Sequence, residues 1–283
     1  MWSTLNPGSP LDNTLGAMLI GGLVSAVLHG MTLIQAYYYF ILYSKDVLYL
    51  KLLVVILLIG DGTYLGLMIY TTYYYLVTNY DNPIQLYQVV WSLTCQTIFM
   101  ILNSSLVQSY YALRVWRFGK NTLFLLVILV LAIAQIVCSA IWVVMMLQAH
   151  SFARLFQMRL LRITMTVLSA VIDVANTMGL IVLLWKSRTG LNKSDSLINK
   201  MIVFFFTTGM MPSICAVGGL ISLVAFSETL IYGSFAACIG KLYTGSFIGT
   251  LNARQSLVQQ LDVTPLCTNF TTCYQTSTTD NII

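Results

Sequence analysis

The residues of this sequence with the clearest capacity for chemistry are three charged side chains inside long apolar runs. They are Asp61, Asp173 and Lys241. Lys241 lies in the stretch FAACIGKLYTGSF, and its nearest charged neighbours along the chain are Glu228 and Arg254. A lysine in such a setting can pair with an acid, hold a ligand, or form a Schiff base with a retinal-like chromophore. The elements that position these side chains decide between the three roles.

The composition identifies the class of protein. The chain has 283 residues, of which 58% are hydrophobic and 8% are charged. Soluble domains carry about 25% charged residues, so this sequence cannot cover a water-facing surface and predicts an integral membrane protein. The formal net charge of +5 is explained by cations in loops beside membrane spans, and we expect no nucleic-acid partner.

Seven apolar runs are long enough to cross a bilayer, which takes about 20 residues each. The predicted fold is therefore all-α, an integral membrane bundle of seven helices within residues 14–250. Residues 1–13 contain no Lys or Arg, so we expect no cleavable signal peptide and a short extracytoplasmic N-terminus. Residues 251–283 have few large apolar side chains and predict a largely disordered cytoplasmic tail. The predicted spans are Thr14–Leu42, Leu50–Val77, Leu86–Leu113, Asn121–Leu147, Arg162–Trp185, Asn199–Phe226 and Thr229–Thr250.

The cations beside these spans predict the orientation. Ten lie on one predicted side, and three, all in the loop after the fourth span, lie on the other. Because cytoplasmic loops are enriched in Lys and Arg, the N-terminus is predicted outside and the C-terminus inside. We expect the plasma membrane rather than an internal membrane. The ten are Lys45, Lys51, Arg114, Arg117, Lys120, Lys186, Arg188, Lys193, Lys200 and Arg254, and the three are Arg154, Arg159 and Arg162.

Small residues at a four-residue spacing suggest how the charged helices meet. They occur in the first, second and seventh spans and allow close approach of helix backbones. If the helices form a sequential ring, the seventh closes against the first two. This places Lys241 near Asp61 and near His29. We therefore predict a polar cluster of these three residues. The small residues at this spacing are Gly22, Ala26 and Gly30, and the pairs Gly62/Gly66, Gly233/Ala237, Ala236/Gly240 and Gly245/Gly249.

The cluster has three interpretations that the sequence leaves open: a neutralised pair that fixes helix packing, a ligand or ion site, and a Schiff base of Lys241 to a retinal-like chromophore with Asp61 as the counter-ion. Asp173, Asn176 and Thr177 form a second polar patch on one face of the fifth span, at i, i+3 and i+4. This patch either lines a cavity or bonds across to Gln135 or Asn103.

Motifs of known classes are missing from the sequence. The third, sixth and seventh spans lack the acidic-Arg-Tyr, Cys-Trp-x-Pro and Asn-Pro-x-x-Tyr motifs of rhodopsin-class receptors. GxSxG, HExxH, P-loop and GxGxxG motifs do not occur either. We therefore expect no enzyme activity, no catalytic residue and no cofactor. The six cysteines have no zinc-type spacing, so no metal site is expected.

Charged residues of the predicted cytoplasmic side have two interpretations as well. They either set topology and cap helices, with Ser194, Asp195 or Ser196 as an N-cap, or they form a docking surface for a cytoplasmic protein partner. The residues of this docking hypothesis are Lys186, Arg188, Asp195, Lys200 and Arg254.

Four stretches resemble a large fungal, mainly basidiomycete, family of seven-helix membrane proteins. They are SKDVLYLKLLV (44–54), YLVTNYDNP (75–83), KSRTGLNKSDSLINK (186–200) and KLYTGSFIGTLNARQSL (241–257). The resemblance extends from about residue 14 to 257. It implies a multi-pass seven-helix bundle whose C-terminal region, about residues 169–255, is a domain of unknown function. It implies no known activity.

The sequence thus predicts a membrane protein of uncharacterised function. Our leading hypothesis is a receptor-like or sensor protein with a polar site between the first, second and seventh helices. The alternatives are a transporter or ion-conducting bundle that uses the same charges, and a membrane-organising protein without a small ligand. The expected surroundings are the lipid bilayer and a cytoplasmic protein partner; the small-molecule ligand is not identified.

Overall fold

The structure of the chain is a computed structural model that describes residues 15–79, 82, 85, 88–120, 122–149, 151–186, 192–225 and 229–253. The predictions for residues 1–13, for the tail beyond residue 253, for Arg188 and for Arg254 lie outside the described residues. So does the side chain of Asp195, although its backbone is helical.

The described residues form helices and no strand, which confirms the all-α prediction; one isolated bridge joins Gln88 and Ser151. The seventh apolar run is helical over residues 231–253, and we call this element the last helix. It continues beyond the predicted end at Thr250. The other helices are α1 (Leu15–Leu42), α2 (Leu48–Tyr73) with the π-helical turn η3 (Tyr74–Thr78), α4 (Trp91–Gly119), α5 (Thr122–Gln148), the short α6 (Phe152–Gln157), α7 (Arg159–Lys186) and α8 (Asn192–Ala225).

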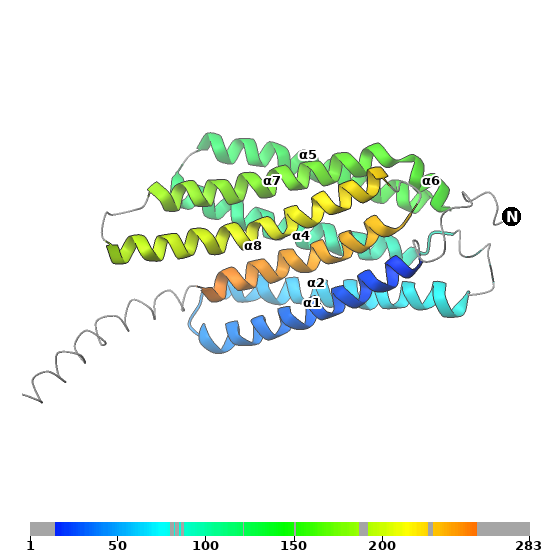
Figure 1. Cartoon of the computed structure of the whole chain (residues 1–283), viewed down its shortest axis with the longest axis horizontal. Helices are drawn as coiled ribbons and strands as arrows, with labels where there is room; N and C mark the ends of the chain where they lie inside the picture. Colours follow the sequence, from blue (N-terminus) through cyan, green and yellow to red (C-terminus); the bar gives the residue numbers. More distant parts are fainter. Residues whose placement is uncertain are drawn as a thin grey trace, which may run out of the picture.

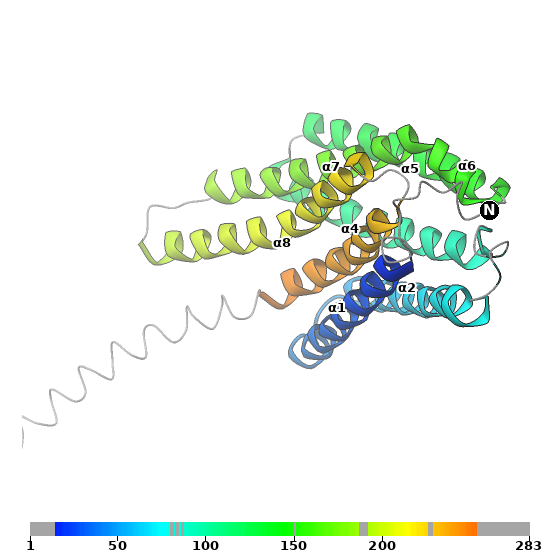
Figure 2. The ribbon, with the colours of Figure 1, turned by 45° about the vertical axis from the view of Figure 1, so that its right-hand side comes forward.

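The long helices lie side by side and alternate in direction along the chain (Figure 1). One end of the bundle holds the start of α1, the α6 helix and the start of the last helix, and we call it the first end. The other end, the second end, holds the α1–α2 turn, the end of α4 and the end of α7. Figure 2 shows that the last helix passes between α1 and α8.

The last helix packs against α1 and α2, as the ring hypothesis predicts. Ser234 donates a hydrogen bond to the carbonyl of Ala17 near the first end, and Asn252 donates one of 2.7 Å to the carbonyl of Gln35 near the second. The helices do not form a simple sequential ring, however. The α4 helix contacts α2, α5 and α7, and its Gln108 also reaches the last helix, so α4 lies in the interior.

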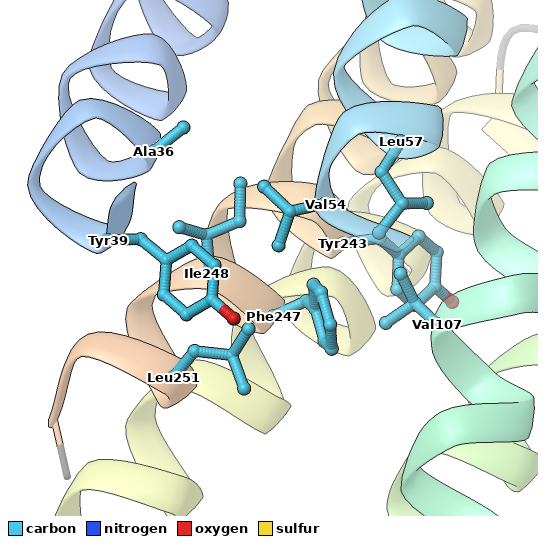
Figure 3. Close-up of a cluster of buried hydrophobic side chains, with 9 residues drawn as sticks. All are labelled: Ala36, Tyr39, Val54, Leu57, Val107, Tyr243, Phe247, Ile248 and Leu251. Carbon is cyan, nitrogen blue, oxygen red and sulfur yellow. The ribbon is translucent and has the colours of Figure 1, made fainter. Parts of the chain in front are cut away.

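A buried apolar cluster joins α1, α2, α4 and the last helix in the half of the bundle nearer the second end (Figure 3). Tyr39, Leu57 and Phe247 are completely buried in it. The rings of Tyr110 and Phe247 meet edge to face with centroids 4.9 Å apart. This packing holds the last helix in place although small residues fill much of its length. Its nine buried residues are Ala36, Tyr39, Val54, Leu57, Val107, Tyr243, Phe247, Ile248 and Leu251.

Within the described residues, five helices are long and apolar enough to cross a membrane: α1, α2 with η3, α5, α7 and the Phe206–Ala225 part of α8. Their outer faces expose large aliphatic side chains, such as Leu23 at 61% and Ile133 at 54%. An apolar outer surface of this extent requires lipid rather than water. The chain is therefore a multi-pass membrane protein. The α4 helix and the last helix carry more polar residues and are not among these five.

Several helix boundaries differ from the predicted ones. The third span begins at Trp91 rather than Leu86 and continues to Gly119, so Arg114 and Arg117 lie in α4 rather than in a loop. Arg159 and Arg162 lie in α7 rather than in the loop before it. The α8 helix begins at Asn192, so the prediction of an N-cap at 194–196 is wrong. Charged residues extend these helices because their long side chains can reach polar surroundings from a helix end.

The small-residue pattern predicts the contacting helices but not the contacting residues. A Cβ on Gly21 would lie 2.6 Å from Cα of Ser234, so α1 and the last helix meet there, one residue from the predicted Gly22. A Cβ on Gly30, Gly66 or Gly233 would meet nothing within 4 Å. The prediction of close approach is therefore wrong at these three glycines.

Candidate functional site

The ammonium group of Lys241 lies against Asp61 of α2. Lys241 Nζ is 3.6 Å from Asp61 Oδ1 and donates a hydrogen bond of 2.5 Å to the backbone oxygen of the same residue. It also lies 5.0 Å from the ring centroid of Tyr64, one helical turn along α2. Lys241 and Asp61 are 1% and 2% exposed. The predicted contact between these two residues is thus present, and the cation has an anion, a carbonyl and an aromatic face as partners.

A third helix holds the carboxylate of Asp61. Asn103 of α4 donates hydrogen bonds to Asp61 Oδ1 at 3.0 Å and to the carbonyl of Leu57 at 3.2 Å. The amide reaches this position because residue 60 is glycine: a Cβ there would lie 2.4 Å from Asn103 Oδ1. Asp61 Oδ2 has no hydrogen-bond partner among the described residues. The pair therefore joins α2, α4 and the last helix.

His29 lies beside this pair without a described hydrogen bond to it. It is half-buried on α1 and close enough to interact electrostatically with both Asp61 and Lys241. Its Nδ1 atom has no hydrogen-bond partner among the described residues, and its Nε2 faces the backbone of α2 at Gly62. The three predicted residues are neighbours, but the specific contacts are those of Lys241 and Asp61.

Asp173 is the centre of a second polar network. Gln108 of α4 donates to Asp173 Oδ1 at 3.0 Å, and the hydroxyl of Tyr243 in the last helix donates to Asp173 Oδ2. Ser169 Oγ lies 2.9 Å from the Tyr243 hydroxyl. Among the described residues Asp173 has no cationic partner in contact, and these donors satisfy both of its oxygens.

The partners predicted for this patch are wrong. Asp173 does not bond to Asn103, which holds Asp61, or to Gln135. Asn176 instead donates to the backbone oxygen of Gln108 at 3.4 Å. Thr177 packs against Gly209 of α8, where a Cβ on the glycine would lie 2.4 Å from Thr177 Oγ1. A crevice of about 20 Å³ adjoins Asp173, Asn176 and Thr177, which is room for one water molecule.

A cavity larger than this crevice adjoins both networks. It has a volume of about 220 Å³ and lies between α4, α5, α7, α8 and the last helix. Neither His29, Asp61 nor Lys241 lines it, but Tyr64 and Tyr243 do. Tyr64 contacts Lys241 and Tyr243 contacts Asp173, so each charged network reaches the cavity wall through one tyrosine.

The cavity wall contains polar groups that are available to a bound molecule. Gln96 of α4 and Gln135 of α5 both line it, and each is 8% exposed. The side-chain oxygen of each is buried without a hydrogen-bond partner among the described residues. A buried amide oxygen without a hydrogen-bond partner destabilises the folded protein. The two glutamines therefore favour the binding of a ligand or water that donates hydrogen bonds.

Arg162 is the residue of this cavity that the sequence analysis missed. It was counted among the loop cations at the start of the fifth predicted span, but it lies inside α7, lines the cavity and is 5% exposed. Its guanidinium carbon lies 5.2 Å from the ring centroid of Tyr232 and 5.8 Å from that of Trp142. The sequence signal that could have found it is its position within an otherwise helical apolar run.

Two of the residues proposed for docking have described side chains. Lys186 and Lys200 are exposed; Lys186 ends α7, and Lys200 lies in the N-terminal part of α8. Among the described residues, no group of three or more His, Cys, Asp or Glu side chains could hold a metal ion.

Comparison with known proteins gives one match. The family of unknown function DUF6534 matches residues 169–256, which agrees with the predicted C-terminal region of unknown function. No curated protein and no solved structure matches the chain. The matched region contains Asp173 and Lys241 but neither Asp61 nor Arg162. The fungal origin and the seven spans implied by the resemblance stay predictions.

Proposed function

We propose that this chain is a seven-pass membrane protein that binds a small molecule inside its bundle and acts as a receptor-like protein or sensor. The observation that carries the proposal is the cavity of about 220 Å³ with two buried amide oxygens in its wall. These oxygens have no hydrogen-bond partner among the described residues, and a bound molecule with hydrogen-bond donors would satisfy them. The proposed site is thus in this cavity and not at Lys241.

The seven-pass topology is part of the proposal. The α4 helix has 29 residues and the last helix covers residues 231–253, which gives about 34 Å for the shorter of them at 1.5 Å per residue. This length suffices for a hydrocarbon core of about 30 Å. Both run antiparallel to their neighbours in chain order, like the five apolar helices (Figure 1). Their polar side chains include Asn103, Gln108 and Lys241, which face the interior of the bundle.

The charged networks have a supporting role in this proposal. Lys241 and Asp61 are packed among three helices and have no contact with the cavity except through Tyr64. We assign them to helix packing, and we assign to Tyr64 and Tyr243 the coupling of cavity occupancy to the two networks. The same packing disfavours the chromophore hypothesis, because the amine of Lys241 is held by Asp61 and does not line the cavity.

Binding is tested by thermal unfolding of the purified protein in lipid nanodiscs with a library of compact organic molecules. A molecule that occupies the cavity raises the unfolding temperature by mass action. The Ala236→Phe variant fills the cavity and should lose this response, whereas Ala134→Phe, an equal change on the exposed face of α5, should retain it. If every molecule that raises the unfolding temperature of the parent protein raises that of Ala236→Phe by the same amount, the cavity is not the binding site.

Flux measurements separate the sensor from the transporter. The transporter alternative is supported if a bound molecule crosses the membrane of proteoliposomes and this flux is lost in Asp61→Asn. Binding without flux supports the receptor-like role. A bundle that binds nothing in the library supports the membrane-organising alternative.

A further inference from the structure

We propose that the ligand of this cavity is a short, uncharged molecule with a hydrogen-bond donor at each of its two ends, such as a rod-shaped diol. It lies along the bundle axis, with one donor bonded to Gln96 and the other to Gln135. This inference rests on the proposed function, since it names the class of molecule that the same cavity takes. Three features carry it: two amide oxygens without partners, their different depths in the bundle, and the wall between them.

The two glutamines give the cavity a pair of hydrogen-bond acceptors. Gln96 belongs to α4 and Gln135 to the neighbouring α5, and both line the cavity. Each residue is more than nine-tenths buried, and its Oε1 atom has no hydrogen-bond partner among the described residues. A buried acceptor without a partner destabilises the protein, so a donor on a bound molecule gains free energy at each oxygen. Two such oxygens on neighbouring helices favour a molecule with two donors.

The two acceptors lie at different depths in the bundle. The start of α4 and the end of α5 both lie at the first end (Figure 1). At 1.5 Å per residue, Gln96 is about 7 Å from the start of α4 at Trp91, whereas Gln135 is about 20 Å from the end of α5 at Gln148. A molecule that bonds to both glutamines therefore extends along the bundle axis.

The wall of the cavity has the length that such a molecule needs. The lining residues of α4 run from Leu93 to Ser104, and those of α5 run from Gln135 to Met146. Each stretch covers about three helical turns, or about 16 Å. A cavity of about 150 Å³ holds benzene, so one of about 220 Å³ has room for about nine or ten non-hydrogen atoms. A rod of this size fits, whereas a peptide or a long-chain lipid does not.

The wall between the glutamines favours an apolar body without charge. Met100 of α4 and Trp142 of α5 line the cavity at intermediate depth and suit a ring or a short hydrocarbon chain. A cation also donates hydrogen bonds, but a buried charge without a counter-ion is costly, and no Asp or Glu is among the described residues that line the cavity. A carboxylate is excluded at these two oxygens because it brings further acceptors instead of donors.

The test compares two isomers of benzenedimethanol on the complete protein in lipid nanodiscs. They have the same composition, but the two hydroxyls point to opposite ends in the 1,4-isomer and lie side by side in the 1,2-isomer. Isothermal titration calorimetry gives each binding constant, and empty nanodiscs give the background from partition into lipid. We expect the 1,4-isomer to bind about fivefold or more tightly, because it alone reaches both glutamines and one net hydrogen bond contributes about this factor. This comparison needs no variant.

Variants then assign the difference to the two glutamines. Gln96→Met and Gln135→Met remove the amide and keep an unbranched side chain. The oxygen that each change removes has no described hydrogen-bond partner, so both variants should keep the fold. In each, the preference for the 1,4-isomer should fall to about twofold or less, since one of its two hydrogen bonds is lost. The matched control is Gln148→Met, which changes an exposed glutamine of α5 that does not line the cavity and should leave both binding constants unchanged.

The possible outcomes distinguish this inference from the proposed function. Equal binding of the two isomers, lost in Ala236→Phe, supports the cavity as a ligand site and overturns the two-ended ligand. A preference for the 1,4-isomer that survives both glutamine substitutions overturns the role of the glutamines. Binding that persists unchanged in Ala236→Phe places these molecules outside the cavity and also overturns the inference. If neither isomer binds, the two-ended ligand is overturned, and the library of the preceding section decides separately whether the cavity binds another class of molecule.

Discussion

Lys241 and Asp61 are joined twice in this structure. The ammonium lies 3.6 Å from the carboxylate oxygen and 2.5 Å from the backbone oxygen of the same aspartate. The two residues are 180 positions apart in the chain and lie on different helices. Both side chains are buried. A buried pair of this kind costs desolvation for both charges, but the removal of one charge costs more, because the other is left without its counter-ion.

The first prediction concerns this pair. Lys241→Met and Asp61→Asn should each destabilise the bundle by about 3–5 kcal/mol, and the double substitution should cost less than either. The measurement is thermal unfolding of the four proteins in one detergent. A double variant that is as unstable as the worse single variant would show that the two charges do not compensate each other.

The second prediction concerns the hydroxyl of Tyr243. It donates to Asp173 Oδ2, accepts from Gln108 at 3.3 Å and bonds with Ser169. Tyr243→Phe removes a single oxygen and leaves these buried groups with fewer partners, so it should cost about 1–3 kcal/mol of unfolding free energy.

The control for this change is Tyr73→Phe, since Tyr73 is 60% exposed and the expected change is within about 0.5 kcal/mol. A double-mutant cycle of Tyr243→Phe with Asp173→Asn should give an interaction energy above about 0.5 kcal/mol. An additive result would mean that the hydrogen bond to Asp173 contributes nothing to stability.

The third prediction compares two glycines of α2. A Cβ on Gly60 would lie 2.4 Å from Asn103 Oδ1, whereas a Cβ on Gly66 would meet nothing within 4 Å. Gly60→Ala should therefore displace the amide that holds Asp61 and cost about 1–3 kcal/mol. Gly66→Ala should stabilise the helix by up to about 1 kcal/mol, because alanine has the higher helix propensity.

Unfolding temperatures of the two alanine variants check this prediction, and opposite signs are expected. Equal effects would mean that α2 and α4 are not in close contact at Gly60. A Gly60→Ala variant that is rescued by Asn103→Ala would identify the amide as the group in conflict.

The fourth prediction concerns the orientation of the bundle. The second end carries most of the described Lys and Arg side chains, so the positive-inside rule places it in the cytoplasm. A cysteine at Arg154 should react with a membrane-impermeant maleimide in intact cells, and a cysteine at Lys120 should react only after permeabilisation. The parent protein measures the background from the native cysteines. Labelling of Lys120→Cys alone in intact cells would reverse the orientation.

The comparison of sequence and structure is most informative at Asp173. The i, i+3, i+4 spacing with Asn176 and Thr177 predicts a polar face of α7, and the structure places Asp173 and Asn176 in hydrogen bonds and buries Thr177 against Gly209. The predicted partners, Gln135 and Asn103, were wrong because a helical period does not determine the rotation of one helix against its neighbours. Gln108 and Tyr243 lie opposite Asp173 because α4 and the last helix enter the interior, which a sequential ring does not predict.

Arg162 shows the same limit from another direction. The sequence analysis placed it at the boundary of the fifth predicted span and counted it with the loop cations, since three arginines follow one another within nine residues. In the structure the helix extends over two of these arginines, and aromatic rings of α5 and the last helix surround the buried one. These rings come from parts of the chain that local sequence cannot bring together, and the cavity between them depends on how five helices fit.

The sequence by itself determined the class of protein, the positions of the long helices and the need for a partner at Lys241, because apolar composition and the cost of a buried charge act locally. Only the tertiary structure decided that Asn103 holds Asp61, that Gly21 rather than Gly22 meets the last helix, and that the cavity lies beside Arg162 instead of beside Lys241. The physical reason is that side-chain contact depends on the axial rotation and depth of each helix. These are set by the simultaneous packing of all its neighbours.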